Sequence, residues 1–413
     1  MAKTLAIVVG GGPAPGINGV ISAATIEARK HNMRVLGFYE GFRYLARGEG
    51  RFMELRIRDV SRIHDKGGSI LRTSRENPTG DREKLRNVLS VFRREGVDYL
   101  LTIGGDDTAF TSSRIAQESG DELGVVHVPK TIDNDLPLPG GFSTFGFQTA
   151  RHRGVEVVRT LMEDAWTTSR WYFVVSMGRK AGHLALGIGQ AAGATLTVIA
   201  EEFEGEVISL DHLVDILEVS ILKRLAMGHS HGVAVLAEGI MEKLPREDLE
   251  RLGEMEQDEF GHLRYAELDL GRLLQREVKR RLERRGIGLK IISKNVGYEL
   301  RCADPIPFDM EYTRTLGYGA LKCLMEGVSR AMVCVVGGKI QAMPFDQMMD
   351  SATGRVAVRY VDIHSERYQV AREYMIRLRR KDVEDKEFLE KLAEAARCSS
   401  KEFLERFGYL IVD

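Results

Sequence analysis

Residues 5–30 read LAIVVGGGPAPGINGVISAATIEARK, and this stretch decides the class of fold. The apolar run at residues 5–9 predicts a buried strand, the three glycines that follow predict a turn, and the remainder through Lys30 has the pattern of an amphipathic helix. A strand, a turn and a helix in this order are typical of α/β proteins.

The glycine loop is also a candidate anion site, because a loop at a helix N-terminus offers backbone N–H groups and the positive end of the helix dipole. The loop matches neither G-x-G-x-x-G nor G-x-x-x-x-G-K-[ST], since Pro15, Ile17 and Asn18 occupy the diagnostic positions. It therefore predicts a phosphate site but disfavours a dinucleotide site and a Walker A loop.

The same alternation continues along the chain, where short runs rich in Val and Ile separate longer, charged segments with helical periodicity. This pattern favours an α/β fold with mostly parallel sheets, and 413 residues predict two or three domains. The expected strands are residues 5–9, 99–103, 124–128, 171–176, 196–200, 232–237, 289–293 and 331–336. Ligands of open α/β sheets bind at the carboxyl ends of strands, so polar residues after these runs are candidate site residues.

Composition narrows the class of function. Lys and Arg number 59 against 60 Asp and Glu, and this balance argues against a nucleic-acid-binding or anionic-membrane-binding surface. No segment reaches the roughly eighteen apolar residues of a membrane span, and the cysteines form no CxxC pair, so a soluble, cytoplasmic protein is expected. The four cysteines are Cys302, Cys323, Cys334 and Cys398.

Two segments read as helical surface. Residues 258–286 are charged and helical in pattern, with bunched cations among Glu277 and Glu283, and the chain from about Val361 onward is again helical. Interspersed carboxylates favour a solvated helix face over a nucleic-acid patch for these cations. The cations are Lys279, Arg280, Arg281, Arg284 and Arg285.

Residues 103–110 read IGGDDTAF and follow an apolar run. A Gly-Gly turn lets a ligand approach the main chain, and a carboxylate there could hold Mg²⁺, which binds through one or two carboxylates plus substrate phosphates. One aspartate would suffice for that role, so the pair Asp106 and Asp107 needs a second explanation. The alternative is a solvated loop or a helix cap, where Asp is also favoured.

The segment PKTIDND at residues 129–135 stands at the end of another apolar run. In an extended segment Asp133 and Asp135 can point in similar directions, and Lys130 could lower their pKa or hold a phosphate. A general base and a metal or substrate ligand could both come from here. The alternative is an Asp-rich turn that caps a helix.

Three further polar segments follow expected strands or stand in a polar stretch. They are Met177-Gly178-Arg179, Ala237-Glu238-Gly239 and Tyr298-Glu299-Leu300-Arg301. Each alone could be a cap or a surface turn, although the arginines suit phosphate because a guanidinium group forms bidentate, permanently charged contacts. Six such segments in one chain favour phosphoryl transfer.

The motifs GGPAPGIN, GGDDT, PKTIDND, MGR, AEG and YELR, in this order, resemble the phosphofructokinase family and in particular its pyrophosphate-dependent branch. The resemblance implies two doubly wound, mostly parallel, Rossmann-like domains with the active site in the cleft between them. It implies a phosphoryl-donor domain at residues 1–148 plus about 300–355, and a sugar-phosphate domain with a helical tail at 149–299 plus about 356–413. Pyrophosphate, fructose 6-phosphate and Mg²⁺ would bind to a homodimer, with a tetramer as the alternative.

The same resemblance assigns roles to single residues. Gly11 would present its N–H group to pyrophosphate, Asp106 would hold Mg²⁺, and Asp133 would accept the proton of the sugar 1-hydroxyl. Thr131 and Asp135 would position substrate and metal. Arg75 would reach the donor phosphates, and Arg170 would act across a subunit interface. The sugar phosphate would be held by Met177, Gly178, Arg179, Glu238, Tyr298 and Arg301.

Asp107 and Lys130 stand where ATP-using relatives have glycine, so the resemblance also suggests how the donor is chosen. A carboxylate at Asp107 would project toward the space of an ATP α-phosphate. Two like charges about 4 Å apart at an effective dielectric of ~20 repel by roughly 4 kcal/mol, on the order of a thousandfold in affinity. Lys130 would offset that charge and bind pyrophosphate, so the pair is predicted to select the donor.

Two positions depart from the ATP-using pattern. Tyr298 stands where those enzymes have histidine, and Ile292 stands where they have an arginine for the 6-phosphate. We hypothesise that Lys294 takes over that contact. His183 is expected to be a structural histidine.

Three other interpretations compete with this one. An ATP-dependent phosphofructokinase that tolerates Asp107 is disfavoured because both selector positions are substituted together. A nicotinamide-dependent dehydrogenase is disfavoured because this chain lacks the G-x-G-x-x-G motif of such enzymes. A regulatory subunit without catalysis would be expected to lose its base or metal ligand, whereas Asp106, Asp133 and Asp135 are all present.

Overall fold

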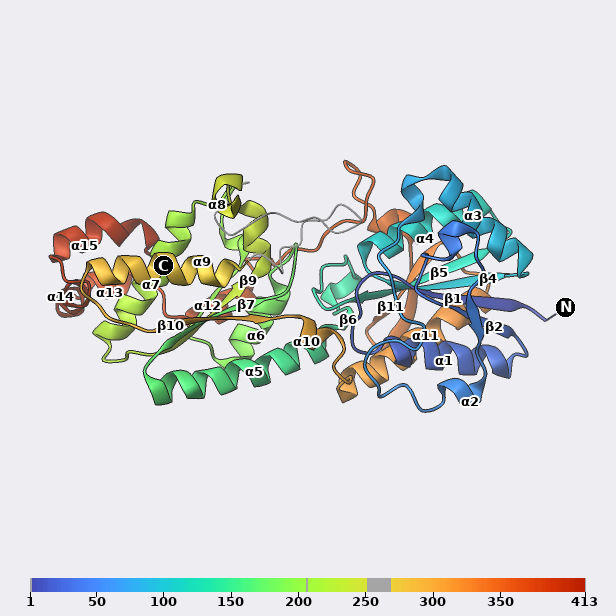
Figure 1. The fold of residues 1–413 in the computed structure, drawn as a ribbon, viewed down its shortest axis with the longest axis horizontal. Coiled ribbons are helices and arrows are strands. Elements are labelled where there is room, and N and C mark those ends of the chain that lie inside the picture. The colour runs from blue at the N-terminus through green and yellow to red at the C-terminus, as the bar shows by residue number, and fades with distance from the viewer. Residues whose placement is uncertain (1, 206, 251–268, 413) are drawn as a thin grey trace. The chain divides into compact units, whose positions relative to one another are not determined.

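The computed structural model describes residues 2–205, 207–250 and 269–412, which form two compact units (Figure 1). Unit 1 comprises Met1–Ala150 and Tyr298–Arg359, and unit 2 comprises Arg151–Gly297 and Tyr360–Asp413. Each unit is therefore built from two separate stretches of chain. No helix among the described residues is long and apolar enough to cross a membrane.

Unit 1 is built on a mostly parallel sheet with the strand order β12-β11-β5-β4-β1-β2-β3, and β6 pairs with β5. Only β3 and β12, at the two edges, run antiparallel to their neighbours. The strands are β1 Thr4–Val9, β2 Arg34–Phe38, β3 Phe52–Glu54, β4 Tyr99–Gly104, β5 Gly124–Thr131, β6 Phe145–Gly146, β11 Ala331–Val336 and β12 Lys339–Pro344.

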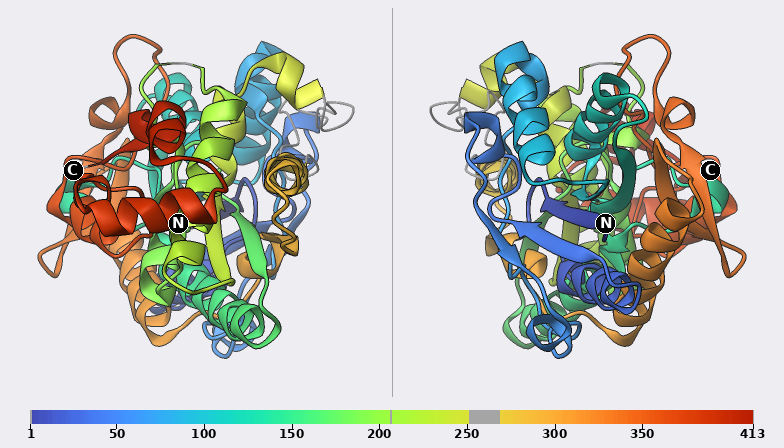
Figure 2. Two further views of the ribbon diagram at one scale, coloured as in Figure 1. Left: turned by 90° about the vertical axis from the view of Figure 1, so that its left-hand side faces the viewer. Right: turned by 90° about the vertical axis from the view of Figure 1, so that its right-hand side faces the viewer.

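Helices cover both faces of this sheet (Figure 1 and Figure 2). One apolar core joins α1 and α11 to one face, and a second core joins α3 and α4 to the other. The helices of unit 1 are α1 Ile17–Lys30, α2 Ile57–Val60, α3 Arg82–Arg94, α4 Asp106–Ser119, α10 Tyr298–Arg301 and α11 Pro307–Met325, while α5 Phe147–Thr168 begins in unit 1 and continues into unit 2.

The direction of winding reverses between β1 and β4, which are neighbours in the sheet. The chain leaves β1 through α1 on one face toward β2, and leaves β4 through α4 on the other face toward β5. Adjacent loops at such a reversal separate, and open α/β sheets bind ligands there. The fold thus places the glycine loop after β1 and the Gly-Gly-Asp-Asp turn after β4 at this position.

Unit 2 has a smaller, fully parallel sheet with the order β10-β7-β9-β8. In Figure 1, α9 lies on one side of this sheet and α6 on the other. The strands are β7 Trp171–Ser176, β8 Leu196–Val198, β9 Gly232–Ala237 and β10 Ile291–Val296. The helices are α6 His183–Ala192, α7 Leu210–Ala226, α8 Arg246–Glu250, α9 Leu270–Arg284, α12 Glu366–Glu373, α13 Arg380–Glu384, α14 Lys386–Ala395 and α15 Ser400–Phe407.

The expected α/β class with mostly parallel sheets is confirmed, although several strands were not predicted. The strand expected at 196–200 ends at Val198 and is followed by a 3-10 turn. The strands β2, β3, β6 and β12 were missed: β3 and β6 are very short, β12 is largely exposed, and Gly37 interrupts the apolar run of β2. Of the segment expected to be helical at 258–286, residues 258–268 lie outside the described residues.

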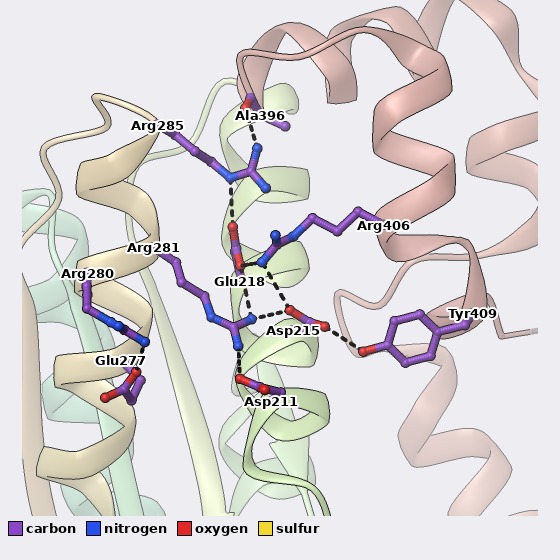
Figure 3. A network of polar contacts seen from close by, with 10 residues as sticks. All are labelled: Asp211, Asp215, Glu218, Glu277, Arg280, Arg281, Arg285, Ala396, Arg406 and Tyr409. Carbon is purple, nitrogen blue, oxygen red and sulfur yellow. Dashed lines mark hydrogen bonds and ion pairs between the residues drawn. The ribbon is translucent and has the colours of Figure 1, made fainter.

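The cations at residues 279–285, in α9 and directly after it, were predicted to form a solvated helix face. This prediction is wrong for Arg281 and Arg285 (Figure 3). Arg281 binds Asp211 and Asp215 of α7, and the Arg285 guanidinium lies 2.8 Å from the fully buried Glu218 carboxylate. Figure 3 also shows Arg406 of α15 and Tyr409 reaching the same carboxylates. Buried ion pairs are costly to break, so this network fixes the C-terminal helices against α7 and α9.

Candidate active site

Three of the predicted motifs follow strands of unit 1 and leave its sheet at the carboxyl end of those strands. Val9 pairs with Ile103, and Ile103 pairs with Val128, so β1 and β4 end together beside β5, which continues to Thr131. The N–H of Gly10 donates to the Ile103 carbonyl at 2.9 Å, which ties the glycine loop to the end of β4. The glycine loop, the Gly-Gly-Asp-Asp turn and the PKTIDND segment therefore come together.

Two glycines allow this close approach, because the Thr108 side chain fills the space beside them. A Cβ atom would lie 2.4 Å from Thr108 Oγ1 at Gly10 and 2.3 Å from it at Gly104. Real Cβ atoms do not approach neighbours this closely, so α4 packs against both loops only if they lack side chains.

The prediction that Gly11 offers its N–H group to a ligand is wrong for this structure. That N–H donates to the Ser74 carbonyl at 2.8 Å, and Gly10 forms a β-bridge with the same residue. The segment 73–75 therefore runs along the glycine loop as an added strand-like partner. It brings the exposed Arg75 next to the loop, in keeping with its predicted place near the donor.

Lys130 is a buried cation near the carboxyl end of β5, and 4% of its surface is exposed. Its Nζ atom donates to the Gly12 carbonyl at 2.5 Å and would lie 3.2 Å from a Cβ atom at Gly11. Burial, with Arg301 adding to the effect, lowers the pKa of Lys130 to about 8. The carboxylates Asp133, Asp106 and Asp135 oppose this shift. One lysine thus interacts with carboxylates from two motifs.

Arg301 approaches the glycine loop from α10. A Cβ atom at Gly12 would lie 3.4 Å from the centre of its guanidinium group, which also lies 5.2 Å from the centre of the Tyr298 ring. Stacking on an aromatic ring holds a guanidinium group in place without neutralising it. The two cations Arg301 and Lys130 therefore flank the glycine loop.

Asp106 and Asp107 are the first two residues of α4, directly after Gly105. The N–H of Asp107 donates to Asp106 Oδ1 at 2.9 Å, so Asp106 also acts at the helix N-terminus, where the dipole favours a negative charge. The helix-cap alternative is not what the structure shows, because Gly105 is the N-cap residue and no side-chain cap hydrogen bond is formed; the magnesium role of Asp106 stays a prediction.

The oxygen ligands present fit Mg²⁺ rather than a transition metal. Within the described ranges no three His, Cys, Asp or Glu side chains form a metal cage. Asp106 and Asp135 both raise the pKa of Lys130, so carboxylates of two motifs lie near one lysine. Mg²⁺ commonly binds one or two carboxylates and completes its shell with substrate phosphates and water.

The PKTIDND segment is not extended through its carboxylates, contrary to the expectation. The strand β5 ends at Thr131, and Asn134 adopts a left-handed conformation with φ 59°. The N–H of Asp133 donates to Thr131 Oγ1 at 3.0 Å. The directions of Asp133 and Asp135 are therefore set by a turn, not by the alternation of a strand.

Unit 2 gathers its predicted residues at the carboxyl edge of its own sheet. Ser176 pairs with Ala237 on one side and with Val296 on the other, so β7, β9 and β10 end together. The N–H of Gly178 donates to Glu238 Oε2 at 3.1 Å, and Glu238 is 6% exposed. This buried carboxylate thereby fixes the loop that carries Met177, Gly178 and Arg179.

Arg179 has a carboxylate neighbour that the sequence did not indicate. Its Nε lies 3.7 Å from Glu242 Oε1, in the 3-10 turn that follows β9. Burial raises the pKa of Glu242, while Arg179 and Lys180 oppose the shift. Lys294 is exposed on β10, two residues before the end of that strand.

Arg170 stands apart from these residues. It precedes the first residue of β7, whereas Met177 follows the last, and a six-residue strand spans roughly 20 Å. Its Nε lies 3.7 Å from Asp164 Oδ2. Within unit 2 Arg170 therefore does not join the Met177–Arg179 loop, and its action across a subunit interface stays a prediction.

The sequence model of one protein family, Phosphofructokinase, matches residues 4–324. This chain belongs to the phosphofructokinase family. Two relatives named pyrophosphate--fructose 6-phosphate 1-phosphotransferase cover nearly the whole length. The one from Thermotoga maritima is 54% identical over 99% of this chain and 99% of its own, and the one from Naegleria fowleri is 50% identical over 99% and 96%.

The family assignment agrees with the fold. The crystal structure of a pyrophosphate-dependent phosphofructokinase from Nitrosospira multiformis matches 91% of each chain with a TM-score of 0.69 at 19% sequence identity. At that identity the match concerns the fold alone. The resemblance to the phosphofructokinase family, inferred from six motifs, is confirmed.

Proposed function

We propose that this phosphofructokinase-family chain transfers a phosphoryl group from pyrophosphate to the 1-hydroxyl of fructose 6-phosphate. The products are fructose 1,6-bisphosphate and phosphate, and the reaction runs in both directions as a step of glycolysis or gluconeogenesis. The observation that carries the proposal is that Asp107 at the start of α4 and the buried Lys130 near the end of β5 both stand at the carboxyl end of the unit 1 sheet. The names of the two relatives above support it.

In the proposed mechanism Asp133 removes the proton of the sugar 1-hydroxyl as that oxygen attacks the near phosphorus of pyrophosphate. The bond from this phosphorus to the bridging oxygen breaks, and phosphate leaves. Lys130 and Arg75 balance the charge of the donor and of the transferred group, while Arg301 and Tyr298, beside the glycine loop, contact the sugar phosphate. Phosphoryl transfer depends mainly on such positioning and charge stabilisation.

Mg²⁺ is the proposed cofactor, with Asp106 as its ligand and Asp135 nearby. When bound, it would neutralise charge on the pyrophosphate oxygens. The contact of Asp106 with the Asp107 N–H is compatible with this role, because a carboxylate group can accept several hydrogen bonds or metal contacts.

Unit 2 is the proposed sugar-phosphate-binding half, and unit 1 is the proposed donor half. Met177, Gly178, Arg179 and Glu238 form the acceptor loop cluster, which Glu238 fixes by accepting the Gly178 N–H. Lys294 and, from a second copy of the chain, Arg170 complete the proposed set. A homodimer and a cytoplasmic location stay predictions.

A comparison of donors tests the proposal. With Mg²⁺ and fructose 6-phosphate, kcat/KM for pyrophosphate should exceed that for ATP by orders of magnitude. In Asp107→Gly this preference should shrink by up to a thousandfold, because the repulsion on the α-phosphate of ATP is removed.

Efficient use of ATP by the unmodified protein would overturn the donor assignment. An unchanged preference in Asp107→Gly would show that donor choice lies elsewhere, while leaving the reaction itself intact. Asp121→Gly, at an exposed carboxylate on the surface, is the matched control and should leave both constants unchanged.

A further inference from the structure

The turn that carries Asp133 and Asp135 is held by a residue far away in the sequence. Arg359 is the last residue of unit 1, more than two hundred positions after the turn. Its Nε and Nη2 atoms donate to the Asn134 carbonyl at 3.1 and 2.8 Å, and Nη1 donates to the Phe142 carbonyl at 2.7 Å.

The main chain of Arg359 holds the next residue of the turn as well. Its N–H donates to the Asp135 carbonyl at 2.7 Å. Its Nη2 also contacts Oδ1 of Asn134. The carbonyl groups of both Asn134 and Asp135 are thus bonded by one residue, directly after the proposed base.

Within the turn, Asn134 has a left-handed backbone conformation that these hydrogen bonds stabilise. It is 4% exposed and has a left-handed φ of 59°, a conformation that asparagine tolerates better than most residues but does not prefer. Its Oδ1 accepts the N–H of Thr144 at 3.0 Å, and the Thr144 hydroxyl donates to the Thr131 carbonyl at 2.7 Å. The turn is therefore bonded by both Thr144 and Arg359, and the two residues share Asn134 Oδ1 as an acceptor.

We infer that Arg359 is a positioning residue that sets the directions of the Asp133 and Asp135 side chains. The inference rests on the proposed function for the roles of those two carboxylates. A guanidinium group suits the task because its planar, fixed set of donors reaches several carbonyls at once. Lysine would keep the charge but not this geometry.

The test compares Arg359→Met and Arg359→Lys with the unmodified enzyme. In R359M, kcat should fall on the order of a hundredfold, since small misplacements of reacting groups cost that much. KM for both substrates should change by less than about threefold, because binding groups stay in place. R359K should lie between R359M and the unmodified enzyme.

Arg29→Met is the matched control. Arg29 also lies in unit 1, donates to a backbone carbonyl, that of Leu55 at 2.7 Å, and pairs with Glu54, away from the turn. R29M should keep its kcat even where its Tm falls. Equal losses of kcat in R29M and R359M would overturn the inference, as would an unchanged kcat in R359M.

Two readouts separate positioning from a general loss of stability. Guanidinium chloride at millimolar concentration should restore part of the kcat of Arg359→Ala, whereas sodium chloride and urea should not. Hydrogen exchange over residues 131–146 should be faster in R359M than in R29M. If R359M fails to fold, R359K takes its place in both measurements.

The exchange measurement does not depend on activity. A protein that fails to phosphorylate fructose 6-phosphate but still shows faster exchange over 131–146 in R359M would contradict the proposed function and keep the support of the turn. Unchanged exchange and no guanidinium rescue, in an active enzyme, would overturn the inference alone.

Discussion

At the sheet edge of unit 1 a buried lysine interacts with three carboxylates, whereas at the edge of unit 2 a half-buried arginine lies beside one. Lys130 is bonded to a backbone carbonyl of the glycine loop, and its pKa is lowered to about 8 by burial. Arg179 is more exposed, and the guanidinium group of arginine is permanently charged in proteins.

The difference indicates two ways of binding phosphate. In unit 1 the position of Lys130 is fixed, and its protonation depends on the charges around it. This suits a donor whose charge changes during transfer. In unit 2 the charge is permanent and the position is adjustable, because Glu242 holds Arg179 only at 3.7 Å. This suits a sugar phosphate whose 6-phosphate keeps its charge throughout the reaction.

The largest expected effect tests whether unit 1 contains the chemistry. Asp133→Asn should lower kcat on the order of a thousandfold, because an amide of the same size cannot accept the hydroxyl proton. Steady-state kinetics with unchanged Tm would check this. Asp65→Asn, at an exposed carboxylate of the same unit, is the control. A loss below tenfold would assign the base elsewhere.

A medium effect tests the adjustable charge of Lys130. Because its pKa is near 8, the lysine loses its proton as pH rises above 8, and KM for pyrophosphate should then rise by about tenfold per pH unit relative to Lys130→Met. The KM for fructose 6-phosphate, bound in part by permanent arginines, should rise less. Parallel pH profiles of the two enzymes would contradict the role of Lys130.

The lowered pKa of Lys130 also makes the stability of the fold depend on pH. Between about pH 8 and the usual pKa of 10.5, the unfolded chain binds the proton of Lys130 and the folded chain does not. The contribution of this residue to the free energy of unfolding therefore rises with pH in that window.

The smallest effect concerns unit 2. Glu242→Gln should free Arg179 and lower KM for fructose 6-phosphate by at most about fivefold, since partly exposed ion pairs contribute little. The kcat should stay the same, because neither residue touches the reacting oxygen in the proposed mechanism. Glu247→Gln, at an acidic residue of α8, is the control. A raised KM would mean that Glu242 aligns Arg179 instead of restraining it.

The sequence indicated most of the fold, because buried parallel strands are continuous apolar runs. The strands β7, β9 and β11 were predicted with their observed bounds for this reason. The edge strands β3 and β12 carry no such run, since one side of each faces solvent. Continuous apolar runs therefore locate most buried strands, whereas strands that are very short, exposed or, like β2, interrupted by a glycine escape detection.

The candidate site divides in the same way. Residues that follow a strand directly, such as Asp106 and Asp133, were predicted because strand ends can be located from the sequence. Arg359 and Glu242 were missed, because their places depend on pairings between distant segments that have no local pattern. Gly11 was assigned an N–H role that Ser74 already takes, for the same reason.

The divided makeup of unit 1 has a consequence for the order of synthesis. Its sheet cannot be completed when residue 150 leaves the ribosome, because β11, β12 and Arg359 follow about two hundred residues later. At roughly 5–20 residues per second this is a delay of about 10 to 40 s. The turn with Asp133 is thus synthesised early and fixed late, and the nascent N-terminal segment would expose the part of β5 that β11 later covers throughout that interval.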